Sequence, residues 1–122
     1  MKNWDAFREQ FRHEDVSTRL GELATNLVRI KFLTEGVTNC DVVEYLLRES
    51  KYFIEWIAAD IDIDLAAELV ELQRLLARWQ LRWEIIWADD AGRTDVVVQA
   101  QRWFDRLVEM ADLLSEPIFR AS

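Results

Sequence analysis

The acidic residues between positions 60 and 71 form the most specific chemical pattern in the chain. Aspartates alternate with isoleucines in Asp60-Ile61-Asp62-Ile63-Asp64, and Glu68 and Glu71 follow. These carboxylates fall at positions 1, 3, 5, 9 and 12 of a twelve-residue loop, as in an EF-hand that holds Ca²⁺. Leu65 stands where that loop needs glycine for its sharp turn. Because aspartates at a helix start are also typical N-caps, we favour a capped helix and predict no metal or other cofactor.

Pairs of acids three residues apart offer a second chemistry. Glu68/Glu71 and Glu109/Asp112 each place two carboxylates on one helical face, as a Mg²⁺ site requires. The two tetrapeptides resemble the Glu-x-x-Glu and Glu-x-x-Asp motifs of MazG-type nucleotide pyrophosphohydrolases, which are all-α enzymes. The resemblance implies Mg²⁺-dependent hydrolysis of nucleoside triphosphates. The alternative, which we favour, is that these acids lie on solvated helix faces.

Two further reactive side chains occur only once each. His13 follows Arg8 in an Arg-x4-His string that resembles the one in all-α HEPN ribonucleases, although we expect His13 to lie in an exposed turn. Cys40 lies at the expected start of a helix, where the helix dipole lowers the pKa of a thiol. A single cysteine excludes a disulfide framework and a cysteine-based zinc site, and it fits a reducing cytoplasm.

Basic and aromatic residues alternate along one predicted helix. Arg74, Arg78 and Arg82 are four residues apart and lie beside Trp79 and Trp83, a combination that can bind nucleic acid by phosphate contact and base stacking. The chain, however, has 15 basic and 23 acidic residues and a formal charge of −8, which repels phosphate. We therefore expect no nucleic-acid partner, and we expect the arginines to form ion pairs or to contact a partner's acids.

The elements that position all these residues are predicted to be helices. Three glycines and one proline in 122 residues are too few for a β-sandwich or β-barrel. Apolar residues recur three and four positions apart in four segments, over about 3–35, 39–60, 65–89 and 95–116. The period slips near 13–17 in the first segment, which indicates a short N-terminal helix followed by a longer one, with one continuous helix as the alternative.

Cap residues define the expected helix ends. Gly36 is expected as the left-handed residue that ends the first long helix. Thr38 and Asp41 have the form of a capping box for the next, and Asp62 or Asp64 would cap the third. The fourth is expected to begin after Thr94 and to stop at Pro117, because proline cannot continue the hydrogen-bond ladder.

Helices of this length with short connections predict an all-α fold. We expect an antiparallel up-down four-helix bundle with a short extra N-terminal helical segment, forming a single domain over residues 1–122. The N-terminal residues lack the apolar stretch of a signal peptide, and no run of 18 apolar residues occurs, so we expect neither secretion nor membrane insertion.

A bundle helix needs only one apolar stripe to face the core, and several predicted helices carry further apolar residues outside that stripe. The predicted helix over 39–60 carries a second, aromatic stripe that includes Tyr45, Tyr52 and Trp56. We interpret the surplus on the predicted helices over 65–89 and 95–116 as a subunit interface, with a two-fold homodimer as the default. The predicted function is a non-enzymatic, cytoplasmic protein-interaction module (an adaptor, regulator or inhibitor), and the alternatives are the MazG-type hydrolase and a calcium sensor. The predicted interface residues are Val70, Leu81, Ile85, Trp87, Val96, Trp103, Met110 and Leu113.

Overall fold

The periodic apolar segments fold into helices connected by short turns. The structure, a computed structural model, describes residues 3–115, so the predicted stop at Pro117 lies outside the described residues. The all-α prediction is confirmed, and so is the break in the first segment. The helices are α1 (Trp4–Arg12), α2 (Val16–Glu35), α3 (Cys40–Ala58), α4 (Ile63–Leu81), α5 (Trp83–Trp87) and α6 (Asp90–Ser115).

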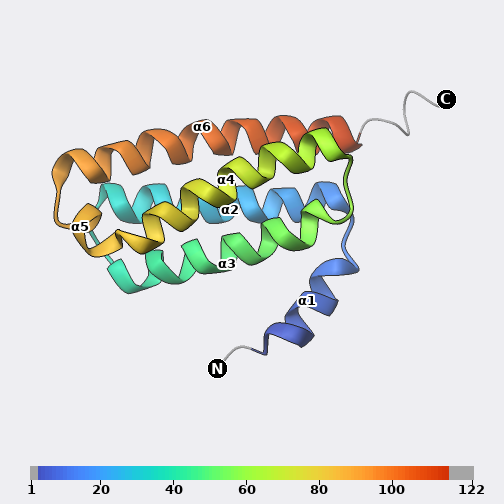
Figure 1. The fold of residues 1–122 in the computed structure, drawn as a ribbon, viewed down its shortest axis with the longest axis horizontal. Helices are drawn as coiled ribbons and strands as arrows, with labels where there is room; N and C mark the ends of the chain where they lie inside the picture. Colours follow the sequence, from blue (N-terminus) through green and yellow to red (C-terminus); the bar gives the residue numbers. More distant parts are fainter. Residues whose placement is uncertain (1–2, 116–122) are drawn as a thin grey trace.

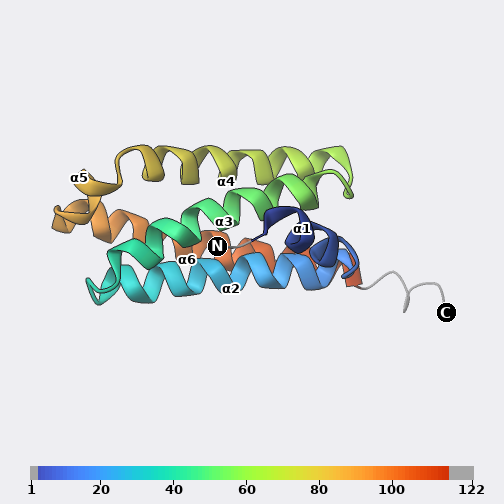
Figure 2. The same ribbon diagram turned by 90° about the horizontal axis from the view of Figure 1, so that it is seen from below.

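The four long helices lie side by side (Figures 1 and 2). Helix α2 packs along α6 and along α3, and α3 packs along α4. Leucines and isoleucines with no exposed surface, such as Leu23, Leu27 and Leu72, fill the space between them. Burial of this apolar surface stabilises the fold by roughly 25 cal/mol per Å².

Polar side chains inside the bundle fix how α2 and α3 sit against each other. The buried Asn26 side chain donates hydrogen bonds to Glu49 Oε1 at 3.1 Å and to Ser50 Oγ at 3.3 Å. Tyr45 donates its hydroxyl proton to the second oxygen of the Glu49 carboxylate at 3.1 Å. Because a buried polar group is costly without its partner, this network favours one register of the two helices.

Helix α1 covers the aromatic stripe that the sequence leaves over on α3. The centroid of the Trp4 ring lies 4.5 Å from that of the Tyr52 ring. The centroids of the Phe7 and Trp56 rings lie 5.8 Å apart, in an edge-on contact. Trp56 is only 8% exposed. Trp56 is therefore not surplus surface, because the chain's own N-terminal helix covers it.

The predicted start and face of α6 are also corrected. The helix begins at Asp90, five residues before Asp95, the first residue expected after a cap at Thr94. Its buried face includes Val96 and Met110, both with 0% of their surface exposed. The sequence pattern places these two residues in the interface, but they belong to the core and are not accessible to a partner.

The turn after α2 places its left-handed residue one position later than expected. Gly36 has φ −81°, whereas Val37 has φ 50°. The Val37 amide donates to the Thr34 carbonyl at 3.1 Å and the Thr38 amide to the Leu33 carbonyl at 3.0 Å, which is the Schellman pattern. A β-branched residue thus takes the conformation that glycine adopts without strain.

Substitution of Val37 by glycine is expected to raise the free energy of unfolding by about 1 kcal/mol, because the left-handed conformation costs a side chain about that much. Urea unfolding measures the change. Gly36→Ala is the matched control and is expected to be tolerated, since Gly36 has a helical φ and an added Cβ would lie 3.4 Å from its nearest neighbour. If Val37→Gly left the free energy of unfolding unchanged and Gly36→Ala lowered it, the residue with left-handed backbone angles would be Gly36 and not Val37.

The predicted third helix is divided in two. It is interrupted at Arg82, whose φ of −112° and ψ of 19° are not helical. The Arg82 amide donates to two carbonyls, those of Arg78 and Trp79, both at 3.2 Å. The break turns the buried Trp83 into the core while Leu81 stays outside.

Candidate functional site

The acidic residues between positions 60 and 71 are not brought together. Asp62 is the N-cap of α4 and accepts the amide hydrogens of Asp64 at 2.9 Å and of Leu65 at 3.1 Å. Asp60 pairs with the buried Arg19 of α2 at 2.9 Å. Because α4 begins at Ile63, residues 63–71 are helical and do not form a twelve-residue loop.

The two acid pairs are joined by an arginine. Arg106 of α6 donates from Nε and from one terminal nitrogen to the two carboxylate oxygens of Glu68, both at 2.7 Å, and its other terminal nitrogen lies 3.9 Å from Glu109. The hydrogen bond from Arg106 lowers the pKa of Glu68, and the same bond raises the pKa of Arg106. Glu71 pairs separately with Arg74, at 3.4 Å. Within residues 3–115, no three histidine, cysteine or acidic side chains are placed to share a metal ion.

Glu68→Gln is expected to lower the free energy of unfolding by about 0.5–1 kcal/mol at neutral pH, the range of a half-exposed ion pair. The folded-state pKa of Glu68 lies below its ordinary value of 4.5, so its contribution is present above that pH and is lost as the pH falls through the folded-state pKa. Urea unfolding at pH 7 and near pH 3 therefore should show a difference from wild type that disappears in acid. An equal loss for the exposed Glu71→Gln, or a difference that persists in acid, would contradict this role.

The two single reactive residues stand at the ends of different helices. His13 is exposed at the C-cap of α1, as expected. Cys40 is the first residue of α3, and the N-cap is Asn39, which makes no side-chain hydrogen bond. The predicted capping box of Thr38 and Asp41 is therefore not in register with the start of the helix. Burial raises the pKa of the Cys40 thiol, and the nearby indole of Trp83 only partly offsets that effect. The thiol is therefore not activated by its position at the helix start.

The side of α4 that points away from the core is exposed and apolar. Leu81 is 87% exposed and Ile63 is 82% exposed, the two highest values among the large apolar residues of the described chain. Ile85 of α5 is 64% exposed and lines the same surface hollow as Leu81. We call this surface the outer face, and it consists of Ile63, Ala67, Val70, Arg74, Ala77 and Leu81 of α4 and Ile85 of α5.

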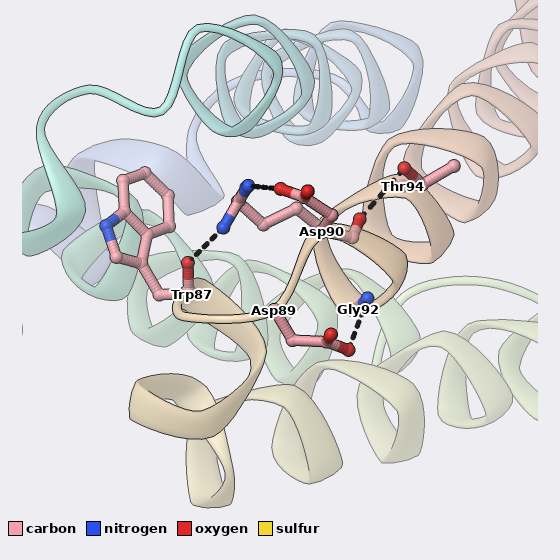
Figure 3. A network of polar contacts seen from close by, with 6 residues as sticks. Trp87, Asp89, Asp90, Gly92 and Thr94 are labelled. Carbon is pink, nitrogen blue, oxygen red and sulfur yellow. Dashed lines mark hydrogen bonds and ion pairs between the residues drawn. The ribbon is translucent and has the colours of Figure 1, made fainter.

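Hydrogen bonds at the start of α6 hold α5 in place (Figure 3). Arg93 donates to the main-chain carbonyl of Trp87 at the end of α5 and forms an ion pair with Asp90. Asp89 accepts the Gly92 amide hydrogen at 2.9 Å and so caps α6. Ile85 is thus displayed by a helix anchored at its end, and its exposure does not come from a loose loop.

A basic groove lies beside the outer face, between α3 and α4. It has a volume of about 440 Å³ and shares Arg74 and Ala77 with the outer face. Arg48 and Lys51 of α3 line its other wall together with the acidic Glu55. Among the described residues, neither Arg48 nor Lys51 forms an ion pair. The Gln73 side chain donates to the Lys51 carbonyl at 3.2 Å and joins the two walls. No sequence pattern marks this groove, because its cations come from two separate helices.

The remaining predicted interface residues are divided between surface and core. Val70 at 38% and Leu113 at 48% are exposed, as are Leu81 and Ile85. Trp87 and Trp103 are half-buried and pack against the core. The exposed members on α4 and α5 share the outer face, whereas Leu113 lies on α6.

Comparisons with protein-family models, with curated proteins and with solved structures find no match for this chain. Within residues 3–115, no helix combines the length and the hydropathy needed to cross a membrane.

Proposed function

We propose that this protein is a non-enzymatic protein-interaction module that binds its partner through the outer face. The observation that carries the proposal is the exposure of Leu81 and Ile85, at 87% and 64%, on helices that are anchored to the core. Transfer of one such side chain from water to an apolar interface contributes about 1.5–3 kcal/mol. The non-enzymatic character is supported by three of the candidate acids: Asp62 caps α4, and Asp60 and Glu68 form ion pairs with arginines.

The arrangement that presents the outer face is, in this proposal, the antiparallel up-down four-helix bundle with an extra N-terminal segment. The packing of α2 on α3 and of α3 on α4, each pair joined by a short turn, supports it. A cytoplasmic location also remains a proposal, and it rests on the single free cysteine, Cys40.

Affinity capture with three forms of the chain tests the function. The baits are the wild type, Leu81→Asp, and Val108→Asp as a matched control. Val108 is 41% exposed on α6, two residues from Arg106, whose side chain points to α4, so Val108 lies on the side of α6 away from the outer face. Any protein identified by mass spectrometry is then purified and its affinity for each bait is measured.

We expect a partner that binds the wild type and Val108→Asp equally and binds Leu81→Asp at least tenfold more weakly, because the substitution removes apolar contact and buries a charge. A second, differently tagged copy of the chain counts as a possible partner. Equal binding to all three forms would contradict the proposal.

A further inference from the structure

The outer face repeats the spacing of the core face. Its α4 residues are Ile63, Ala67, Val70, Arg74, Ala77 and Leu81, separated by alternating steps of four and three. Such a heptad series forms one continuous stripe along a helix and is the spacing by which two helices pack together. All six residues are exposed, and the stripe runs along the 19 residues of α4, a length of about 28 Å.

We propose that the outer face binds a second copy of this chain, with the two α4 helices antiparallel about a two-fold axis beside Leu72. The proposal rests on the proposed function and names its partner. The series is symmetrical about Leu72, so this alignment places Ile63 against Leu81 of the partner subunit. Ala67 then lies against Ala77 of the partner subunit, and two such small side chains allow the helices to approach closely.

The central arginine of the series decides between the two directions of pairing. In a parallel pair, Arg74 would lie at the same level as Arg74 of the partner subunit, with two like charges between the helices. In the antiparallel pair it lies against Val70 of the partner subunit, with its guanidinium beside Glu71 of the partner subunit. The Arg74 side chain is 69% exposed and already lies 3.4 Å from Glu71 of its own chain, so it can contact both carboxylates.

The charges along α4 are complementary only in the antiparallel direction. The acids Asp64 and Glu71 lie in its first half, and Arg74 and Arg78 lie in its second half. Asp64, Glu71 and Arg78 are seven residues apart and flank the outer face on one side. Same-side positions meet in an antiparallel pair, so Asp64 of each copy lies near Arg78 of the partner subunit. The same register brings Glu71 next to Glu71 of the partner subunit at the axis, where the Arg74 side chains of both copies offset the two negative charges. The dipoles of two antiparallel helices also attract each other.

The size of the face sets the expected strength of the pair. Contact along one helix of this length and its flanking side chains gives an interface at or below about 1,200 Å² in total, the range of transient complexes. We therefore expect a reversible dimer with a dissociation constant in the micromolar range, populated in concentrated solution and dissociated on dilution.

A charge exchange tests both the partner and the direction. Asp64→Arg places two arginines together at each end of the pair, and Arg78→Asp places two aspartates together. Sedimentation equilibrium should show each variant alone to dimerise at least tenfold more weakly than wild type. Mixed in equal amounts, the two variants should associate again, because the arginine introduced into one then meets the aspartate introduced into the other. Asp95→Arg and Arg102→Asp, both exposed on α6, are the control pair and should dimerise like wild type.

Rescue by mixing also excludes misfolding of either variant as the cause of the loss. A mixture that stays monomeric, or single variants that dimerise like wild type, would overturn the antiparallel pairing. A wild type that is monomeric at all concentrations would overturn the second copy as the partner. The proposed function would still stand in that case if another protein bound the wild type and not Leu81→Asp.

Discussion

Met110→Ala is expected to lower the free energy of unfolding by about 3 kcal/mol, within the range of 2–5 kcal/mol for truncation of a fully buried methionine. Met110 has no exposed surface, and it packs in the core together with Val96 and Leu107 of the same helix. Loss of its side chain removes this contact and leaves a cavity that the surrounding long helices fill only in part. Urea or thermal unfolding, followed by tryptophan fluorescence, measures the loss.

Leu113→Ala is the matched control on the same helix. Leu113 is 48% exposed, so its truncation should change the free energy of unfolding by no more than about 0.5 kcal/mol. The sequence periodicity favours Ala111 and Leu114 as the inner face of this helix and places Met110 in a subunit interface. A larger loss for Leu113→Ala than for Met110→Ala would support that assignment and contradict the structure.

Asp60→Ala is expected to lower the free energy of unfolding by about 2–3 kcal/mol, because it removes the partner of a buried charge. The Arg19 side chain is 5% exposed, and it donates to Asp60 at 2.9 Å and to the Trp56 carbonyl at 3.3 Å. Without Asp60, the Arg19 guanidinium keeps only one hydrogen-bond acceptor, the Trp56 carbonyl, in an apolar environment. The expected cost is below the 3–5 kcal/mol of a fully buried pair, since Asp60 is 42% exposed and water can partly replace it.

Removal of both charges should be milder than removal of one. Arg19→Met removes the buried charge and keeps an aliphatic side chain in its place, so Asp60→Ala should have little further effect in that background. The double-mutant cycle is expected to give a coupling energy above about 1 kcal/mol. Additive losses, or a negligible effect of Asp60→Ala in the wild type, would show that the pair does not stabilise the fold.

The helical class and the start of α4 after Asp62 follow from local chemistry, which is why periodicity and cap residues predict them. The break at Arg82 has no such signal, because neither glycine nor proline marks it and the apolar period continues through Trp83. It arises from tertiary packing, which turns the buried Trp83 toward the core. The left-handed Val37 is a similar case, since a glycine stands one residue earlier and local propensity favours it.

The candidate site could be predicted in part. The sequence indicated that Leu81 and Ile85 point away from the core, and both are exposed. The sequence pattern overestimates the apolar surface that α3 leaves exposed, because no local signal shows that α1 covers Trp56. The second heptad series on α4 can be read from the spacing of Ile63, Ala67 and Val70. It is weak as an apolar pattern, because one of its six positions is an arginine and two are alanines.

The mass of the wild-type chain as a function of concentration tests the central claim, that the outer face exists to be covered by protein. Light scattering should give 14.5 kDa in dilute solution and a rise toward twice that value as the concentration increases. Leu81→Asp should remain at the monomer mass over the same range, and Val108→Asp should follow the wild type. A Leu81→Asp variant that associates as the wild type does, or a wild type that never exceeds the monomer mass and binds no other protein through Leu81, would contradict the claim.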